Sequence, residues 1–311
     1  MDAYDLVLGL PHTNHVGLAE HLLLMSAGHL QWTSIARAIG RPLSTLRTIS
    51  GGEVYATFYF IEESFPEAAP IAGFGLDDRL TFGVFLRAFK NIAVEGQVLF
   101  DHAPRIAATL AAASDRPGTD AVARHPYIRF ANIFITPEAG NSRLRVAPPA
   151  NADFSGLPPL PNDENPYHLT RSAETTGRLG ALDGSWRPVD RQAGFEHRYP
   201  IDPDRDTNGA GLVYFAHYVA FMDAAERSAL TENCRRPFDA AEVTRRTVEH
   251  RRIAYYGNVG VTDSVRTEVS LFLRGDDATR VGIRYKIRRN EDGRLICLSE
   301  AVKRLPGTST A

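Results

Sequence analysis

The pattern Thr-Asn-x-x-Gly-Leu occurs twice in this chain, at residues 13–18 and 207–212. Its asparagine can donate and accept hydrogen bonds, and its glycine frees the backbone to turn. A run with helical spacing follows each copy, which would place the pattern at a helix N-terminus with unpaired N–H groups and a positive dipole end. Such donors stabilise negative charge that develops on an oxygen atom. We assign Asn208 to catalysis and Thr207, Gly211 and Asn14 to binding, although Asn14 also fits a structural cap in a degenerate copy.

A second group of chemically useful residues lies on a predicted strand, residues 54–61. Apolar residues alternate there with Tyr55, Thr57 and Tyr59, which carry hydroxyl groups. Period-two alternation of aromatic and β-branched residues indicates a strand with two unlike faces. A tyrosine there could donate a proton or act as a phenolate nucleophile. Because the ordinary tyrosine pKa is about 10, the donor role is favoured.

The elements that must position these residues follow the same order in both halves. Each copy of the pattern follows a short strand-like segment and precedes a helix-like run, 20–39 in the first half and 214–230 in the second. Strand-like segments come next, at 54–61, 80–89, 93–101 and 129–135, and then at 247–255, 264–273, 280–288 and 295–302. Their short connections require an antiparallel sheet. We therefore predict an internal duplication and an α+β fold, a tandem (double) hot-dog in which each sheet curves around a long helix.

A proline- and glycine-rich stretch separates the two halves. Residues 147–191 show no lasting apolar periodicity, so we predict a connector with at most one short strand. The predicted domains are an N-terminal hot-dog at 1–146 and a C-terminal hot-dog at 192–311.

Composition excludes several classes of function. A formal net charge of -2 provides no basic field for nucleic acid. No stretch is long and apolar enough for a membrane span, so we expect a cytoplasmic protein without membrane contact. The two cysteines, Cys234 and Cys297, lie far apart, and the histidines near the first pattern lack suitably spaced partners. We expect neither a disulfide nor a metal.

The second half resembles the 4-hydroxybenzoyl-CoA thioesterase class of hot-dog proteins, through residues 206–218 (DTNGAGLVYFAHY) and 221–227 (FMDAAER). In that class an aspartate in the loop before the helix drives hydrolysis, and the matching position here is Asn208. A neutral amide cannot act as a base, but it can donate to a thioester or enolate oxygen. The resemblance thus implies acyl-thioester binding and leaves hydrolysis open, with Asp206 or Glu226 as substitute carboxylates.

Over its whole length the chain resembles a narrower family, the double hot-dog acyltransferase/decarboxylases of polyketide biosynthesis such as the leinamycin pathway. The resemblance rests on the two patterns, on residues 28–32 (GHLQW) and on 54–59 (VYATFY). It implies methylmalonyl-CoA as substrate, transfer of the decarboxylated acyl group to an acyl carrier protein, and catalysis by a strand tyrosine. Tyr55 matches that tyrosine, and Tyr59 is the second choice, assigned to substrate binding.

Three other functions stay open at this point. They are a plain acyl-CoA or acyl-carrier-protein thioesterase, a non-catalytic acyl-thioester binding module, and a hot-dog dehydratase, for which no clear histidine–acid pair stands out. Coenzyme A enters as part of the substrate and no separate cofactor is expected. His217 is interpreted as a helix-packing residue, and the basic run at 245–252 as a solvated strand face or a clamp for a coenzyme A phosphate. A homodimer is left open.

Overall fold

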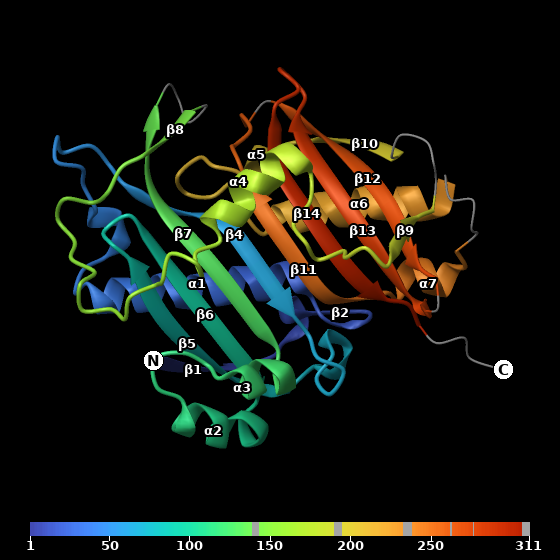
Figure 1. Ribbon diagram of the computed structural model, residues 1–311, viewed down its shortest axis with the longest axis horizontal. Coiled ribbons are helices and arrows are strands. Elements are labelled where there is room, and N and C mark those ends of the chain that lie inside the picture. Colours follow the sequence, from blue (N-terminus) through green and yellow to red (C-terminus); the bar gives the residue numbers. More distant parts are fainter. Residues whose placement is uncertain (139–142, 190–194, 233–237, 262, 276, 307–311) are drawn as a thin grey trace. The chain divides into compact units, whose positions relative to one another are not determined.

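The computed structural model describes residues 1–138, 143–189, 195–232, 238–261, 263–275 and 277–306. The chain divides into two compact units, Met1–His168 and Leu169–Ala311. Each unit holds one long helix and a set of antiparallel strands (Figure 1).

The first unit pairs five strands in the order β1-β5-β6-β7-β4, and every pair is antiparallel. A sixth strand, β8, pairs with β7, and the short β2 and β3 form a separate hairpin. The strands are β1 (Asp2–Val7), β2 (Thr13–Asn14), β3 (Gly17–Leu18), β4 (Tyr55–Ser64), β5 (Arg79–Phe89), β6 (Ala93–His102), β7 (Tyr127–Glu138) and β8 (Arg143–Val146).

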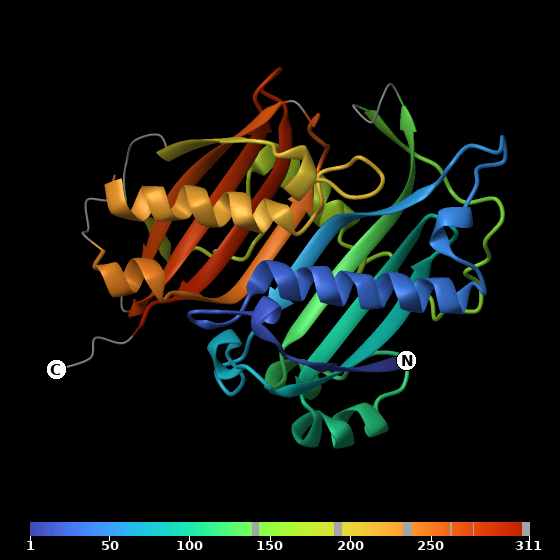
Figure 2. The same cartoon turned by 180° about the vertical axis from the view of Figure 1, so that it is seen from behind.

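Helices cover both faces of this sheet. The long helix α1 (Glu20–Ala38) crosses one face (Figure 2), where Gln31 fills the space that a side chain at Gly96 of β6 would need. The other face carries α2 (Ala103–Ala112) and α3 (Thr119–Arg124), and there Leu110 fills the space beside Gly83 of β5. Strand β6 is therefore buried on both faces, which explains its nearly continuous burial.

The second unit repeats this order as β10-β12-β13-β14-β11, again antiparallel throughout, with β9 pairing to β12. Its long helix, α6 (His217–Glu232), comes after β10 in the chain, as α1 comes after β1 and the β2–β3 hairpin in the first unit (Figure 2). The strands are β9 (Trp186–Pro188), β10 (Phe195–Pro200), β11 (Thr247–Tyr255), β12 (Ser264–Arg274), β13 (Asp277–Arg289) and β14 (Leu295–Arg304). A long helix against an antiparallel sheet, present twice, makes this an α+β double hot-dog, as the sequence predicts.

Short helices are the elements that the sequence pattern missed. They are α2, α3, α4 (Tyr167–Thr176), α5 (Pro203–Asp206) and α7 (Ala240–Thr244), with 3₁₀ turns η1 (Leu10–His12), η2 (Leu43–Thr45) and η3 (Ile71–Gly73). The predicted connector at 147–191 contains the helix α4 in addition to one short strand, β9. The division between the units falls inside this stretch.

Strand β4 departs from simple alternation at Tyr59. Phe58 pairs with Asn132 and Phe60 with Ala131, so Tyr59 is an extra residue in a β-bulge. A bulge shifts the pleat, so Tyr55 and Tyr59 do not follow one unbroken period-two pattern along the strand.

Candidate functional site

The first copy of the repeated pattern is a tight hairpin. Thr13 pairs with Leu18, and the Asn14 side-chain oxygen accepts a hydrogen bond from the Val16 N–H at 2.9 Å. Gly17 has a φ of 135°, and a Cβ there would lie 2.7 Å from the backbone of Ala72. Asn14 therefore supports the turn, and Gly17 is required both by its φ and by the close approach of η3.

The second copy repeats this turn in the second unit. The Asn208 side-chain oxygen accepts hydrogen bonds from the N–H groups of Ala210 at 3.0 Å and Leu212 at 3.1 Å. Gly211 has a φ of 68°, and Thr207 donates its hydroxyl to the Pro203 carbonyl at 2.6 Å. The predicted residues Thr207, Asn208 and Gly211 thus lie in one loop.

The backbone of this loop is largely occupied by its own hydrogen bonds. The Asn208 N–H donates to the Leu212 carbonyl at 2.8 Å, the Gly211 N–H to the Asn208 carbonyl at 2.9 Å, and the Val213 N–H to the Asn258 side chain at 3.2 Å. Several N–H groups that the sequence suggested as free donors are therefore engaged. Because the Asn208 side-chain oxygen is held by the loop, its Nδ2 is the half of the amide that can serve a ligand.

A carboxylate and an imidazole flank this loop. Asp206 is fully buried, and one of its oxygens lies 3.3 Å from Nδ1 of His217, the first residue of α6. Asp206 also accepts hydrogen bonds from Arg205 and from the Asp202 N–H, both at 2.9 Å. Burial alone would raise the pKa of Asp206, but the hydrogen bonds from Arg205 and Asp202 bring this pKa below its ordinary value. An ionised carboxylate beside Nδ1 orients His217 and leaves Nε2 for proton transfer.

Tyr55 lies at the start of β4 and is half-buried. Its hydroxyl donates to the Glu53 carboxylate at 2.7 Å. This hydrogen bond raises the pKa of Tyr55 above its ordinary value, and partial burial raises it further. The surroundings of Tyr55 therefore favour the phenol over the phenolate, and its catalytic role stays a prediction.

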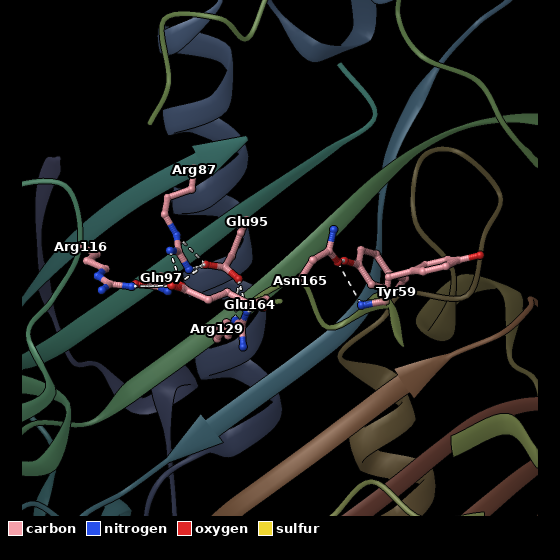
Figure 3. Close-up of polar contacts among 9 residues, drawn as sticks. Tyr59, Arg87, Glu95, Gln97, Arg116, Arg129, Glu164 and Asn165 are labelled. Atoms are coloured by element: carbon pink, nitrogen blue, oxygen red, sulfur yellow. Dashed lines mark hydrogen bonds and ion pairs between the residues drawn. The ribbon is translucent and has the colours of Figure 1, made fainter. Parts of the chain in front are cut away.

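Tyr59 is buried, and its hydroxyl donates to the Asn165 side chain at 2.8 Å (Figure 3). Burial raises the pKa of Tyr59 well above its ordinary value. The same Asn165 oxygen accepts from the Tyr167 N–H at 3.0 Å. Tyr59 thus anchors the segment that leads into α4.

A buried ionic network lies near Tyr59 in the first unit (Figure 3). The Glu95 carboxylate is fully buried and binds Arg87 at 2.6 Å, while Arg129 binds its other oxygen. Glu164 binds Arg87 at 2.5 Å and Arg116 at 3.0 Å. These ion pairs fasten the chain near residue 164 across β5, β6 and β7, which is a structural role.

The second unit holds a comparable network beneath α6. Buried Glu226 binds Lys303 at 2.7 Å, accepts the Tyr285 hydroxyl at 2.6 Å and pairs with Arg246. Burial alone would raise the pKa of Glu226, but Arg246 and Lys303 hold it far below its ordinary value. Arg251 is also fully buried, so the basic run at 245–252 is not a solvated strand face. Glu226 is a structural anion here, which leaves Asp206 as the carboxylate beside the loop.

No group of three or more His, Cys, Asp or Glu side chains suited to a metal ion occurs among the residues that the structure describes. No helix in the described ranges is long and apolar enough to cross a membrane. Cys297 is buried and makes no disulfide, whereas Cys234 lies outside the described residues.

Several solved thioesterase structures share this fold. An acyl-ACP thioesterase from Bacteroides thetaiotaomicron superposes with a TM-score of 0.59 at 10% identity and covers 97% of each chain. A putative oleoyl thioesterase from Lactobacillus plantarum has a TM-score of 0.61 at 12% identity, covering 97% of this chain and 95% of its own. The 12:0-ACP thioesterase from Umbellularia californica has a TM-score of 0.60 at 11% identity, covering 98% and 94%. No family model and no curated protein matches the sequence. At these identities the likeness establishes the tandem hot-dog fold over nearly the whole chain.

The pairing of Asp206 with His217 is the feature that sequence reasoning missed. We interpreted His217 as a packing residue and found no clear histidine–acid pair. Two signals were available, because an acid directly precedes the second pattern and a histidine opens the helix after it. What the sequence did not reveal is that the turn folds back and brings these positions together.

Proposed function

We propose that this chain is an acyl-thioester enzyme that acts on acyl groups carried by coenzyme A or an acyl carrier protein, with the second-unit loop as its chemical centre. The fold shared with three thioesterase structures supports the substrate class. The observation that carries the proposal is the Asp206–His217 pair beside a loop that fixes the orientation of the Asn208 amide.

Hydrolysis is the reaction that this geometry supports best. Asn208 Nδ2 would donate to the thioester carbonyl oxygen, and His217 Nε2 would take a proton from water as the water oxygen bonds to the carbonyl carbon. Collapse of the tetrahedral intermediate breaks the C–S bond, and the imidazolium returns the proton to the leaving thiolate. Asp206 acts through His217 and is a positioning residue.

Decarboxylation with acyl transfer is the second candidate, favoured by two observations. Asn208 is neutral where the resembling thioesterase class has its aspartate, and Tyr55 is held as a phenol. A malonyl-type thioester loses carbon dioxide without a base if donors stabilise the resulting enolate, which then takes up a proton. On this proposal methylmalonyl-CoA would supply an acyl group that passes to a carrier-protein thiol, as in polyketide biosynthesis.

One assay separates the two reactions. The full chain is incubated with decanoyl-, malonyl- and methylmalonyl-CoA, with and without a carrier protein, and products are followed by mass. Free acid with free coenzyme A supports hydrolysis, whereas a carrier-bound acyl group with loss of carbon dioxide supports transfer. No turnover of any thioester would reject both and leave a binding module.

Two variants assign the chemistry. We expect His217→Gln to lower hydrolytic turnover about 100-fold, because a positioned general base contributes at least that much. His29→Gln, an exposed histidine on α1, is the matched control and should leave turnover unchanged. Tyr55→Phe should lower decarboxylation far more than stability and leave hydrolysis intact. Full hydrolysis by the His217 variant would end the proposed mechanism.

A further inference from the structure

A pair of side-chain amides lies deep in the first unit, on residues that the proposed reactions do not use. Gln31 of α1 donates from Nε2 to the Asn132 side-chain oxygen of β7 at 2.7 Å. Both side chains are fully buried, at 0% exposure. Gly96 makes this packing possible, because a Cβ at that position would lie 2.5 Å from the Gln31 side chain.

The pair is only half satisfied. Among the residues that the structure describes, none donates to Gln31 Oε1 and none accepts from Asn132 Nδ2. A buried polar atom without a partner destabilises a fold, so such atoms in a protein require an explanation. Here one free acceptor and one free donor belong to two amides that touch each other.

Other buried polar groups on the same helix face do not share this property. Ser34, one turn further along α1, is 1% exposed, and its hydroxyl pairs with the Tyr4 hydroxyl at 2.9 Å. In the second unit Glu226 of α6 forms an ion pair with Lys303 of β14, and it also accepts a hydrogen bond from the Tyr285 hydroxyl. Buried hydroxyls without a partner also occur in the described part of the second unit, at Thr267 and Ser299, but the α1–β7 contact brings two half-satisfied amides together.

The surroundings of the pair are apolar and aromatic. Trp32, next to Gln31, stacks on Phe58 with ring centroids 5.0 Å apart, and Phe58 contacts Phe130 at the same distance. Phe58 pairs with Asn132 across β4 and β7. A ligand suited to this environment is an apolar chain that carries one small polar group.

We propose that the Gln31–Asn132 pair binds the hydroxyl group of a hydroxylated acyl chain. A hydroxyl has one donor and can accept, so it can donate to Gln31 Oε1 while it accepts from Asn132 Nδ2. This inference rests on the proposed function in one respect, because it takes the ligand to be an acyl group. It adds that a hydroxyacyl group is preferred over an unsubstituted one of equal length.

Binding of free acids tests the inference without requiring turnover. The full chain is titrated by calorimetry with decanoic acid and with its α-, β- and ω-hydroxylated forms. We expect at least one hydroxylated acid to bind about tenfold more tightly than decanoic acid, a difference of about 1.4 kcal/mol. Equal affinity for all four acids, or no binding of any, would overturn the inference and indicate that the amides hold only structural water.

Two variants locate the preference. The double variant Gln31→Leu with Asn132→Leu removes both amides together, so it should fold and bind decanoic acid while it loses the tenfold preference. Ser34→Ala is the matched control, since it removes a satisfied buried hydroxyl from the same helix face and should keep the preference. A double variant that still favours the hydroxylated acid would refute the assignment. Because thioester turnover is not measured here, failure of this test is distinguishable from failure of the proposed function.

Discussion

The two units use the same backbone plan with different polar groups. In each, an Asn-x-x-Gly turn precedes the long helix, and the asparagine oxygen binds the N–H two residues on. The long helix then contacts a central strand of the sheet through polar groups. In the first unit these are an amide pair between α1 and β7, and in the second they are ion pairs of Lys303 in β14 with Glu226 and Asp223 of α6. The turn has thus kept its structural role after duplication, while the side chains around it have diverged.

The divergence is sharpest at the residue before each turn. His12 occupies this place in the first unit and accepts a hydrogen bond from the Gly9 N–H at 2.9 Å. Asp206 occupies it in the second unit, accepts from the Asp202 N–H and also faces His217. Both residues secure the turn before them, but only the second contacts an imidazole at the start of the helix. This contact is the main reason to place chemistry in the second unit.

The largest expected difference between the units is in the free energy of unfolding that each loses when its polar contact between helix and strand is removed. Glu226→Gln leaves Lys303 and Arg246 without their buried anion, so we expect a loss of about 3–5 kcal/mol in the free energy of unfolding, measured with urea. The double leucine variant of Gln31 and Asn132 should be close to neutral by the same measurement. Similar losses in both variants would contradict the distinction between an ionic and an amide link.

The next largest difference is expected between the stability costs of replacing the two turn glycines, Gly17 and Gly211. Gly17→Ala combines an unfavourable φ of 135° with a contact of 2.7 Å to Ala72, so a loss of about 2–4 kcal/mol is expected. Gly211→Ala incurs the left-handed φ penalty at an exposed position and should cost about 1 kcal/mol. Thermal unfolding of both variants checks this order, and a larger cost at Gly211 would contradict the close approach at Gly17.

Acid should weaken the second-unit turn. Because the pKa of Asp206 is lower in the folded chain than in the unfolded chain, its ionisation adds stability above the ordinary aspartate pKa, and this stability is lost as pH falls through the folded value. Asp206→Asn should therefore reduce the acid dependence of the free energy of unfolding, measured with urea at neutral and at acidic pH. His12→Asn is the corresponding first-unit variant, and an unchanged acid dependence in the Asp206 variant would show that other carboxylates dominate.

Small stability effects should come from the two turn asparagines. Asn14→Ala and Asn208→Ala each remove a side-chain acceptor from a turn, at a cost of about 1 kcal/mol. Their effects on activity should differ, because only Asn208→Ala should also lower thioester turnover, by about tenfold or more. Equal loss of turnover in both variants would mean that the two turns contribute alike.

The fold was largely predictable because its long elements have strong periodicity. The predicted strand at 247–255 coincides with β11, and those at 54–61 and 93–101 end within three residues of the ends of β4 and β6. Short helices such as α4 were missed because their stability comes from tertiary packing: Ala173 of α4 is fully buried against the second sheet. The bulge at Tyr59 was also not predictable, since apolar alternation continues through it.

The site was predictable only in part, and for a similar reason. The repeated pattern identified the turns, and the amide at Asn208 does hold its loop. The contacts that decide the chemistry form only when the chain folds. Asp206 and His217, for example, are eleven residues apart in the sequence, and the turn between them brings their side chains together. The hydrogen bond from Tyr55 to Glu53 depends on the backbone conformation just before β4 begins, and the alternation of apolar and polar residues does not specify that conformation.

The exchange of His12 for Asp206 between otherwise similar turns has a consequence for stoichiometry. If turnover needs an imidazole–carboxylate pair at the turn before the long helix, the described residues hold one such centre despite the two hot-dog halves, since the His125–Asp101 pair of the first unit lies elsewhere. Rapid mixing with excess thioester should then show the turnover of one equivalent per polypeptide in the first cycle. Fusion of the halves in one gene allows this specialisation, because a mutation in one half is not copied into the other as it would be in a symmetric dimer.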